Sequence, residues 1–244
     1  MKAIGIDLGG TNIKGVLADA NGQILKAIQL QTNEKEERHW KTSIKTLVQT
    51  LQENHGQPGI PVGVSAPGLA GKNNDRIVLM PGRLAGLEHF VWRDFLGTPT
   101  WVLNDAHAAL IAETSFGTGK GYADVLMLTL GTGVGGGVMI GGELHQGLLN
   151  RAGHVGHVSL NADSDARDIT NMPASLEDAI GDCRIEQRSF GRVTSTHGLV
   201  EAVRRGDRLA VYTWVHSVKK LATALCSFIN ILSPEIIILG GGIS

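Results

Sequence analysis

The feature that most constrains the fold is an order of strands and glycine turns that occurs twice along the chain. Residues 2–8 (KAIGIDL) are predicted to form a strand, followed by the turn GGTN and two further strands. Residues 123–130 (ADVLMLTL) start the same order again, with the glycine turn GTGVGGG at 131–137 before the strands VMIG and LHQG. Apolar runs separated by glycine turns are typical of antiparallel meanders. The repetition predicts two related α/β domains. We place them at residues 1–104 and 105–244.

Helices and buried strands are predicted around these meanders. A helix over 33–56 is indicated by apolar residues at helical spacing and by Gly56 as its stop. The strands IPVGVSAPG and TPTWVLN flank a Pro/Gly-rich insertion at 68–98, and a helix follows the second of them. In the helix over 33–56, the apolar residues predicted to form one buried face are Trp40, Ile44, Leu47, Val48 and Leu51. A long helix over 208–232 is predicted to bury Trp214, Val218, Leu221, Leu225, Phe228 and Leu232. The buried strand EIIILGGG at 235–242 completes the series.

Composition narrows the class of protein. With 42% hydrophobic residues, 18% charged residues and a net charge of −1, the chain is globular, and neither nucleic acid nor a membrane is an expected partner. Met1 leads directly into a strand and no signal peptide is recognised, so we expect a cytoplasmic protein. Cys183 and Cys226 are expected to be free thiols in a reducing compartment, buried as small apolar residues. Because the chain stops just after a glycine turn, we expect a C-terminal truncation.

Three glycine clusters stand at strand ends: DLGGTN, LGTGVGGG and LGGGIS. Glycine lets backbone approach a ligand closely, and the N–H groups of such turns bind anions. Thr11 and Thr132 add hydroxyl donors, and Lys14 is a candidate for a position near a phosphate. Although one such turn needs no function, three of them, two at equivalent positions in the repeated halves, suggest one nucleotide held in a cleft between the halves. No P-loop or Rossmann motif is present.

The pair Asn104 and Asp105 stands where a strand hands over to a helix. Helix capping is the simplest interpretation, because Asn and Asp are favoured N-cap residues. The alternative is that Asp105 takes the proton of an acceptor hydroxyl during phosphoryl transfer. Both roles are compatible at one helix N-terminus. Asp7, at the end of the first strand, is a candidate to hold Mg²⁺ through water.

The ordered motifs DLGGTNIKG, SAPG, LNDA, LGTGVGGG, Gly156–His157, SLE and LGGGI resemble those of the ROK family, a group of bacterial sugar kinases and related repressors. The resemblance covers essentially the whole chain and implies the actin-like ATPase (ribonuclease H-like) fold, two α/β domains with an interdomain cleft. It implies that Asp105 is the catalytic base and Asn104 a sugar ligand. Residues implied around ATP are Gly9, Gly10, Thr11, Thr132, Gly133 and Gly241. Residues implied around the sugar are Gly68, His157 and Glu177.

Two departures from the family pattern matter. His154 stands where the family has a glutamate that grips sugar hydroxyls, so the identity of the sugar is open. The family's zinc site uses His157 and three cysteines, whose places here are held by Asp168, Thr170 and Ser175. No structural zinc is therefore expected, although a different metal pair, His154 with His157, is an alternative. Ser175 instead predicts a helix start, which would make Glu177 a first-turn acid rather than a sugar ligand.

The expected function is an ATP-dependent kinase that phosphorylates the 6-hydroxyl of an aldohexose such as glucose, with ATP and Mg²⁺ as cofactors. One alternative is a sugar-responsive repressor. It would need a helix-turn-helix module before the first strand, and we expect none because that strand follows Met1 directly. The other alternative is an actin-like ATPase. Family habit suggests a homodimer. Arg184, Arg188 and Arg192 are candidates either for a phosphate clamp or for a solvated loop.

Overall fold

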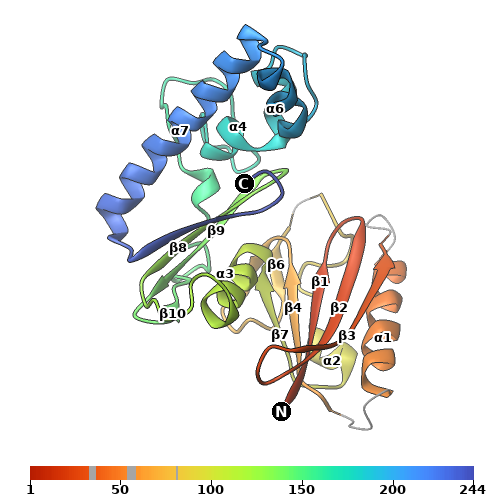
Figure 1. Cartoon of the computed structure of the whole chain (residues 1–244). Coiled ribbons are helices and arrows are strands. Elements are labelled where there is room, and N and C mark those ends of the chain that lie inside the picture. Colours follow the sequence, from red (N-terminus) through yellow and green to blue (C-terminus); the bar gives the residue numbers. More distant parts are fainter. Residues whose placement is uncertain (33–36, 54–58, 81) are drawn as a thin grey trace. The chain divides into compact units, whose positions relative to one another are not determined.

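The computed structural model describes all residues except 33–36, 54–58 and 81 (Figure 1). Its strands are β1 (Lys2–Leu8), β2 (Asn12–Asp19), β3 (Ile24–Gln31), β4 (Val62–Ala66), β5 (Leu69–Ala70), β6 (Ile77–Leu79), β7 (Thr100–Asn104), β8 (Val125–Leu130), β9 (Val134–Ile140), β10 (Glu143–Leu144) and β11 (Ile236–Gly240). Its α-helices are α1 (Glu37–Glu53), α2 (Trp92–Leu96), α3 (Asp105–Phe116), α4 (Leu176–Ile180), α5 (Ile185–Arg188), α6 (Thr196–Arg204) and α7 (Arg208–Leu232), and η1 (Val155–His157) and η2 (Asp182–Arg184) are 3₁₀ turns.

The chain forms two compact units. Unit 1 comprises Met1–Ala109 with Gly147–Arg151, and unit 2 comprises Leu110–Gln146 with Ala152–Ser244. The division at 104/105 made from the sequence stays a prediction.

Unit 1 is built on a five-stranded sheet in the order β3-β2-β1-β4-β7. The first three strands are the predicted antiparallel meander, and β4 and β7 add in parallel to β1. Every second residue of β1 is apolar, and Ile4, Ile6 and Leu8 are buried because alternate side chains of a strand share one face.

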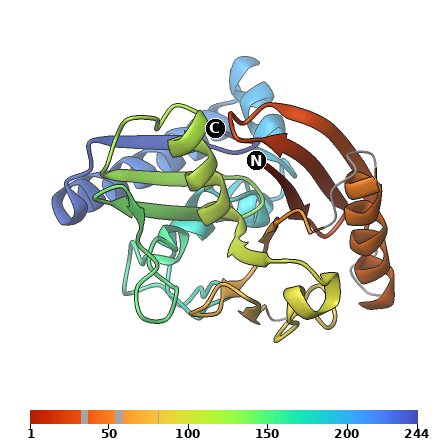
Figure 2. The same ribbon diagram turned by 90° about the horizontal axis from the view of Figure 1, so that it is seen from below.

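Helix α1 covers one face of this sheet, and the orange helix beside the red strands in Figure 2 shows the arrangement. All five residues of the predicted stripe are buried, so its apolar spacing identified the correct face. A side chain at Gly15 would collide with Leu47, which shows how closely the helix approaches β2. The predicted first residues of this helix, 33–36, and its predicted stop, Gly56, lie outside the described residues.

The insertion at 68–98 contains the β5–β6 hairpin and α2, and it completes the core of unit 1. Trp92 is fully buried and packs beside Trp40, with ring centroids 5.6 Å apart. Phe90 meets both rings edge to face. Aromatic pairs at these distances and angles are favourable beyond their buried area.

Unit 2 repeats the topology. Its sheet has the order β10-β9-β8-β11, with an antiparallel meander followed by a strand parallel to the first. The corresponding strands of unit 1 have the order β3-β2-β1-β4. The third strand of this meander is predicted as LHQG. The strand observed there, β10, is shorter and contains only the two residues Glu143–Leu144.

The glycine turn predicted at 131–137 is wrong in its second half. The turn contains only Gly131–Gly133, and Gly135–Gly137 lie within β9. At Gly136 the reason is space, since a Cβ there would lie 2.5 Å from the Val155 side chain and 2.7 Å from Gly153 O. This glycine lets the segment around η1 approach the strand closely.

The long helix α7 has the predicted bounds, and five of the six predicted positions face the core: Phe228 is buried, and Trp214, Leu221, Leu225 and Leu232 are partly buried against it. Val218 is 46% exposed, whereas Ala210, Thr213, Ser217, Ala224 and Phe228 are buried. Small residues on this face let α4 and α6 pack closely against the helix (Figure 1). The prediction of a buried Val218 is therefore wrong.

The burial predicted for the two cysteines is also wrong. Cys183 in η2 and Cys226 on α7 are free, and both are exposed. Among the described residues, no helix combines the length and apolar character needed to cross a membrane.

Candidate active site

The parallel strands of unit 1 place several predicted site residues at one sheet edge. Strands β1, β4 and β7 run in the same direction, with Asp7 beside Ser65 and Ala66 beside Asn104 in the register. Ligands of open α/β sheets bind at the carboxyl ends of such strands. Asp7 accepts a hydrogen bond from the Ser65 hydroxyl at 3.0 Å, a partner that sequence reasoning missed although Ser65 stands near the end of the SAPG strand.

Asp105 begins α3 at this edge, and its Oδ1 accepts a hydrogen bond from Ala106 N at 2.8 Å. The pKa of its carboxyl is raised above the ordinary value, first because the surrounding protein desolvates it and also because the negative charge of Asp7 lies near. The residue nevertheless remains solvent-accessible. A substrate hydroxyl can therefore reach a carboxyl that is partly desolvated, which is a setting suited to a general base.

Asn104 links this helix start to the loop after β4. Its Nδ2 donates to Gly68 O at 3.0 Å, and its Oδ1 accepts from Ala106 N at 3.0 Å. Gly68 has φ +100°, and a Cβ there would lie 2.6 Å from Leu79 O. The amide of Asn104 keeps a second N–H and a second lone pair, so capping does not exhaust its hydrogen-bonding capacity.

The turn Gly9–Thr11 follows β1 at the same edge. It is closed by a hydrogen bond from Gly9 N to Asn12 O at 3.0 Å. Lys14 lies directly opposite Asp7 in the β1–β2 register, and residues in opposite positions project from the same face of a sheet. The structure thus brings the unit 1 set of predicted site residues to one edge: Asp7, Gly9, Gly10, Thr11, Lys14, Gly68, Asn104 and Asp105.

Unit 2 places two glycine turns side by side at the ends of β8 and β11, which are parallel. The turn Gly131–Gly133 follows β8, and its carbonyls accept hydrogen bonds from Asp182 N and Cys183 N at 3.0 and 2.8 Å. Gly241 follows β11 with φ +108°, and a Cβ there would collide with the backbone of Leu130. Such turns hold backbone N–H groups in fixed positions, as an anion site requires.

Asp182 is a second residue that sequence reasoning missed. Its backbone N–H holds Gly131, and its Oδ1 accepts from the N–H of Thr196 at 2.8 Å and from the Thr196 hydroxyl. It therefore fastens the start of α6 to the glycine turn. No motif in the sequence marked it.

Glu177 lies against the same turn. Ser175 begins α4 as predicted, with its side chain accepting a hydrogen bond from Asp178 N. Glu177 is buried in the first turn of this helix, and its Oε2 accepts from Val134 N at 3.0 Å. A Cβ on Gly133 would collide with this carboxylate. Glu177 thus braces the glycine turn, a contact that neither sequence interpretation included.

His154 and His157 flank η1, which packs on the start of β9. A Cβ at Gly156 would collide with Val134 O, so this segment approaches β9 as closely as backbone allows. His157 Nδ1 lies 2.8 Å from Asp168 Oδ2. His154 precedes η1, and its Nε2 is buried. The structure therefore gathers His154, His157 and Glu177 around one strand end in unit 2.

The three arginines of the segment 183–192 are engaged by the protein. Arg188 is partly buried and donates to three carbonyls at the end of α4, those of Asp178, Ile180 and Gly181, at 2.8–2.9 Å. Arg184 donates to Asp178 Oδ1 at 3.0 Å, and Arg192 to Asp207 Oδ2 at 3.2 Å. These contacts favour a structural role over a phosphate clamp.

Replacing Arg188 with alanine is expected to lower the free energy of unfolding by about 3 kcal/mol, because charge-assisted hydrogen bonds to three carbonyls are lost. The measurement is urea unfolding monitored by circular dichroism. Arg192→Ala is the control: it removes an arginine that is 57% exposed, and a much smaller loss is expected. Equal losses in the two variants would contradict the assignment.

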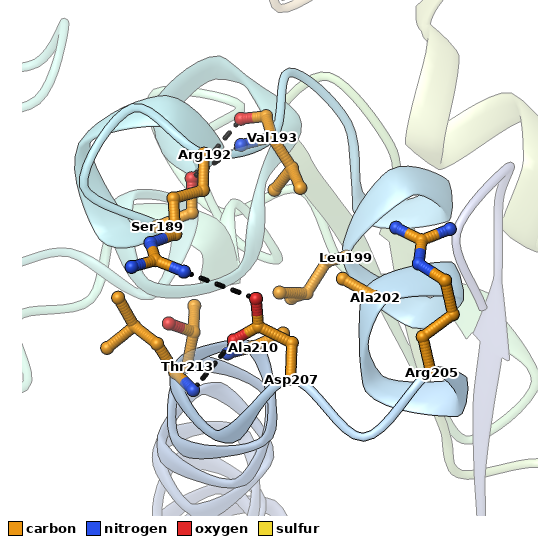
Figure 3. A pocket seen from close by; sticks show the side chains of 10 residues that line it. Ser189, Arg192, Val193, Leu199, Ala202, Arg205, Asp207, Ala210 and Thr213 are labelled. Atoms are coloured by element: carbon orange, nitrogen blue, oxygen red, sulfur yellow. Dashed lines mark hydrogen bonds and ion pairs between the residues drawn. The ribbon is translucent and has the colours of Figure 1, made fainter.

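A cavity of about 270 Å³ opens between the segment after α5, helix α6 and the start of α7 (Figure 3). Leu199, Ala202 and Ala210 line it, and the Arg192–Asp207 ion pair stands at its side. Arg192, a candidate for the phosphate clamp, is among its lining residues, but none of the residues predicted to bind nucleotide or sugar lines it. It is therefore separate from the candidate site.

Comparison with known proteins gives consistent matches along the whole chain. A family model described as the ROK family matches residues 3–244. The glucokinase of Thermotoga maritima is 30% identical over 268 residues, which cover 100% of this chain and 83% of that protein. Other relatives are named as an N-acetylgalactosamine kinase or a xylose repressor.

Solved structures give the same result. A ROK hexokinase from Thermus thermophilus has a TM-score of 0.86 at 26% identity, covering 100% of this chain and 82% of that one. A ROK family glucokinase from Streptomyces griseus, in complex with glucose and AMPPNP, has a TM-score of 0.80 at 26% identity, covering 100% and 84%. These likenesses confirm the predicted fold class, the actin-like ATPase fold.

Proposed function

The chain belongs to the ROK family, and on this premise we propose that it transfers the γ-phosphoryl group of MgATP to the 6-hydroxyl of an aldohexose such as glucose. The observation that carries the proposal is the position of Asp105, a solvent-accessible carboxyl with a raised pKa at the carboxyl ends of the parallel strands β1, β4 and β7. Relatives named glucokinase support the class of reaction.

The proposed role of Asp105 is that of general base. Its carboxylate orients the sugar hydroxyl and accepts the proton as the hydroxyl oxygen bonds to the γ-phosphorus. The bond between the γ-phosphorus and the bridging oxygen breaks, and ADP leaves with that oxygen. Asn104 fixes the start of α3 through Ala106 N and so helps to aim the carboxylate.

The proposed nucleotide ligands are the glycine turns. Gly9, Gly10 and Thr11 in unit 1 and Thr132, Gly133 and Gly241 in unit 2 offer backbone N–H groups and two hydroxyls to phosphates. Asp7 fits a role near Mg²⁺, because a carboxylate at the sheet edge is the hard oxygen donor that this ion prefers. When bound, Mg²⁺ neutralises negative charge on the transferred phosphoryl group. Lys14, opposite Asp7, adds positive charge.

The proposed sugar ligands are Gly68 and Asn104 in unit 1 and His154, His157 and Glu177 in unit 2. His154 replaces the glutamate expected from the family pattern, and an imidazole offers one acceptor where a carboxylate offers two oxygens. Glucose, other hexoses and N-acetylhexosamines are therefore all to be tested.

A sugar-responsive regulator is the second candidate, since some relatives are named as repressors. The two functions differ in turnover: a kinase releases ADP only when its sugar is present, whereas a regulator binds sugar without consuming ATP. A panel of hexoses and N-acetylhexosamines, with ADP release from MgATP as the readout, is expected to identify at least one sugar that stimulates turnover. Sugar binding by calorimetry without stimulation by any sugar would favour the regulator.

A further inference from the structure

A buried carboxylate stands directly behind one of the proposed sugar ligands. The side chain of Asp168 is 1% exposed, and its Oδ2 lies 2.8 Å from Nδ1 of His157, whose own side chain is 19% exposed. Asp168 Oδ1 accepts three hydrogen bonds: from Thr170 N at 2.8 Å, from the Thr170 hydroxyl at 2.8 Å and from Met172 N at 3.0 Å. Both oxygens of this carboxylate are thus hydrogen-bonded within the protein.

We propose that Asp168 is a positioning residue that holds His157 as the Nδ1–H tautomer without a metal ion, so that Nε2 is offered as an acceptor to a sugar hydroxyl. The contact between Nε2 and a sugar hydroxyl rests on the proposed function, whereas the pairing of Asp168 with His157 does not.

The hydrogen-bond network dictates the tautomer. Thr170 and Met172 give Asp168 only donors, and an ionised carboxylate only accepts. A carboxylic acid is a much stronger acid than an imidazolium, so in a hydrogen-bonded pair of the two the shared proton belongs to the imidazole. Asp168 therefore carries no proton to donate, and Nδ1 of His157 must be the donor in this pair. In a neutral imidazole the other nitrogen, Nε2, is then the acceptor.

The same residues do not fit the zinc site implied by the family pattern. Zinc in structural sites is held by thiolates and imidazoles, and the three cysteine places hold Asp168, Thr170 and Ser175. Their oxygens already have protein partners: Thr170 Oγ1 donates to Asp168, and Ser175 Oγ accepts from Asp178 N to begin α4. The loop that a metal would close is closed here by the carboxylate of Asp168.

The replacement changes what the imidazole presents. A histidine bound to a metal through one nitrogen carries its proton on the other and donates from it. A neutral histidine that donates from Nδ1 to a carboxylate accepts at Nε2. Substituting the metal by Asp168 therefore inverts the polarity of the hydrogen bond offered at this position, which makes His157 and Asp168 determinants of sugar preference.

The first test is spectroscopic and needs no turnover. In the full chain, dialysed against EDTA and labelled with ¹⁵N-histidine, long-range ¹H–¹⁵N correlation spectra are expected to show His157 protonated at Nδ1 and unprotonated at Nε2. In Asp168→Asn this preference should be lost, whereas in Thr170→Val, which keeps the His157 partner, it should persist. His157 protonated at Nε2 in the wild type, or unchanged in Asp168→Asn, would overturn the proposal. So would a change of the His157 signals or of the melting temperature on adding Zn²⁺.

The second test is kinetic. With the best sugar of the panel, Asp168→Asn is expected to raise KM for the sugar about tenfold and to leave KM for ATP nearly unchanged. An equal change in both constants would point to general loss of structure and would contradict a positioning role. If the wild type turned over no sugar, the proposed function and the sugar contact would both fail, while the spectra would still decide the tautomer. The two failures are therefore distinguishable.

Discussion

Replacing Asp105 with asparagine is expected to lower kcat for sugar phosphorylation by at least about 100-fold, because general-base catalysis contributes this much or more. Asparagine keeps the shape of the side chain and an oxygen to accept from Ala106 N, but it takes no proton. The wild type should also lose activity in acid, because Asp105 becomes protonated. Since the pKa of Asp105 is raised, this loss should set in at a higher pH than for an ordinary aspartate. The measurement is the pH profile of ADP release at saturating sugar and MgATP.

The same substitution is expected to leave the melting temperature unchanged or higher. A carboxyl whose pKa is higher in the folded than in the unfolded chain binds its proton more tightly when folded. Stability therefore falls as pH rises from the ordinary aspartate pKa through the raised one, and the full cost of the charge is present at neutral pH. Removing the charge removes that cost.

Asp94→Asn, an exposed residue of α2 in the same unit, is the control, and neither its activity nor its stability should change. Loss of activity together with a lower melting temperature in Asp105→Asn would show that the residue serves the fold rather than the reaction. Retained activity would exclude it as the base.

Replacing Gly156 with alanine is expected to have the largest effect on stability, a loss of about 3 kcal/mol and roughly 10 °C in melting temperature. The added Cβ would collide with the carbonyl oxygen of Val134, and a backbone atom cannot rotate away as a side chain can. Val134 N is held by Glu177, so a shift of this strand also disturbs Glu177 and the neighbouring His157. Differential scanning calorimetry measures the stability loss.

The matched control is Gly63→Ala in β4. A Cβ at Gly63 meets nothing within 4 Å, and its backbone does not require glycine. The melting temperature of this variant should remain close to that of the wild type. If Gly156→Ala were as stable as Gly63→Ala, the close approach of η1 to β9 would be wrong.

The residues of the candidate site that follow strand ends could be predicted from the sequence. Asp7, Gly68 and Asp105 each stand within two residues of the end of a strand, and parallel strands end at one edge of a sheet. The same reasoning identified the turns at Gly131 and Gly241. The helical stripe of α1 was also readable, because large apolar residues at the correct spacing have only one way to be buried.

Other features depend on contacts that a periodic pattern does not encode. Gly136 and Gly156 are glycines because two backbone segments meet there, and the sequence alone cannot distinguish such a meeting from a turn. The buried face of α7 also includes the small residues Thr213 and Ser217, which carry little hydrophobic signal. The pairing of His157 with Asp168 spans a loop whose path only the structure gives, so the sequence identified Asp168 merely as the place of a missing cysteine.

The central claim, phosphoryl transfer to a sugar with Asp105 as base, is tested most directly by the product. ³¹P NMR of MgATP with the best sugar of the panel, for the wild type and Asp105→Asn in parallel, identifies every phosphorus-containing product. The proposed function predicts a sugar 6-phosphate and ADP in equal amounts from the wild type, and neither from the variant over the same time. ADP with inorganic phosphate and no sugar phosphate, or the same sugar phosphate from both proteins, would contradict it.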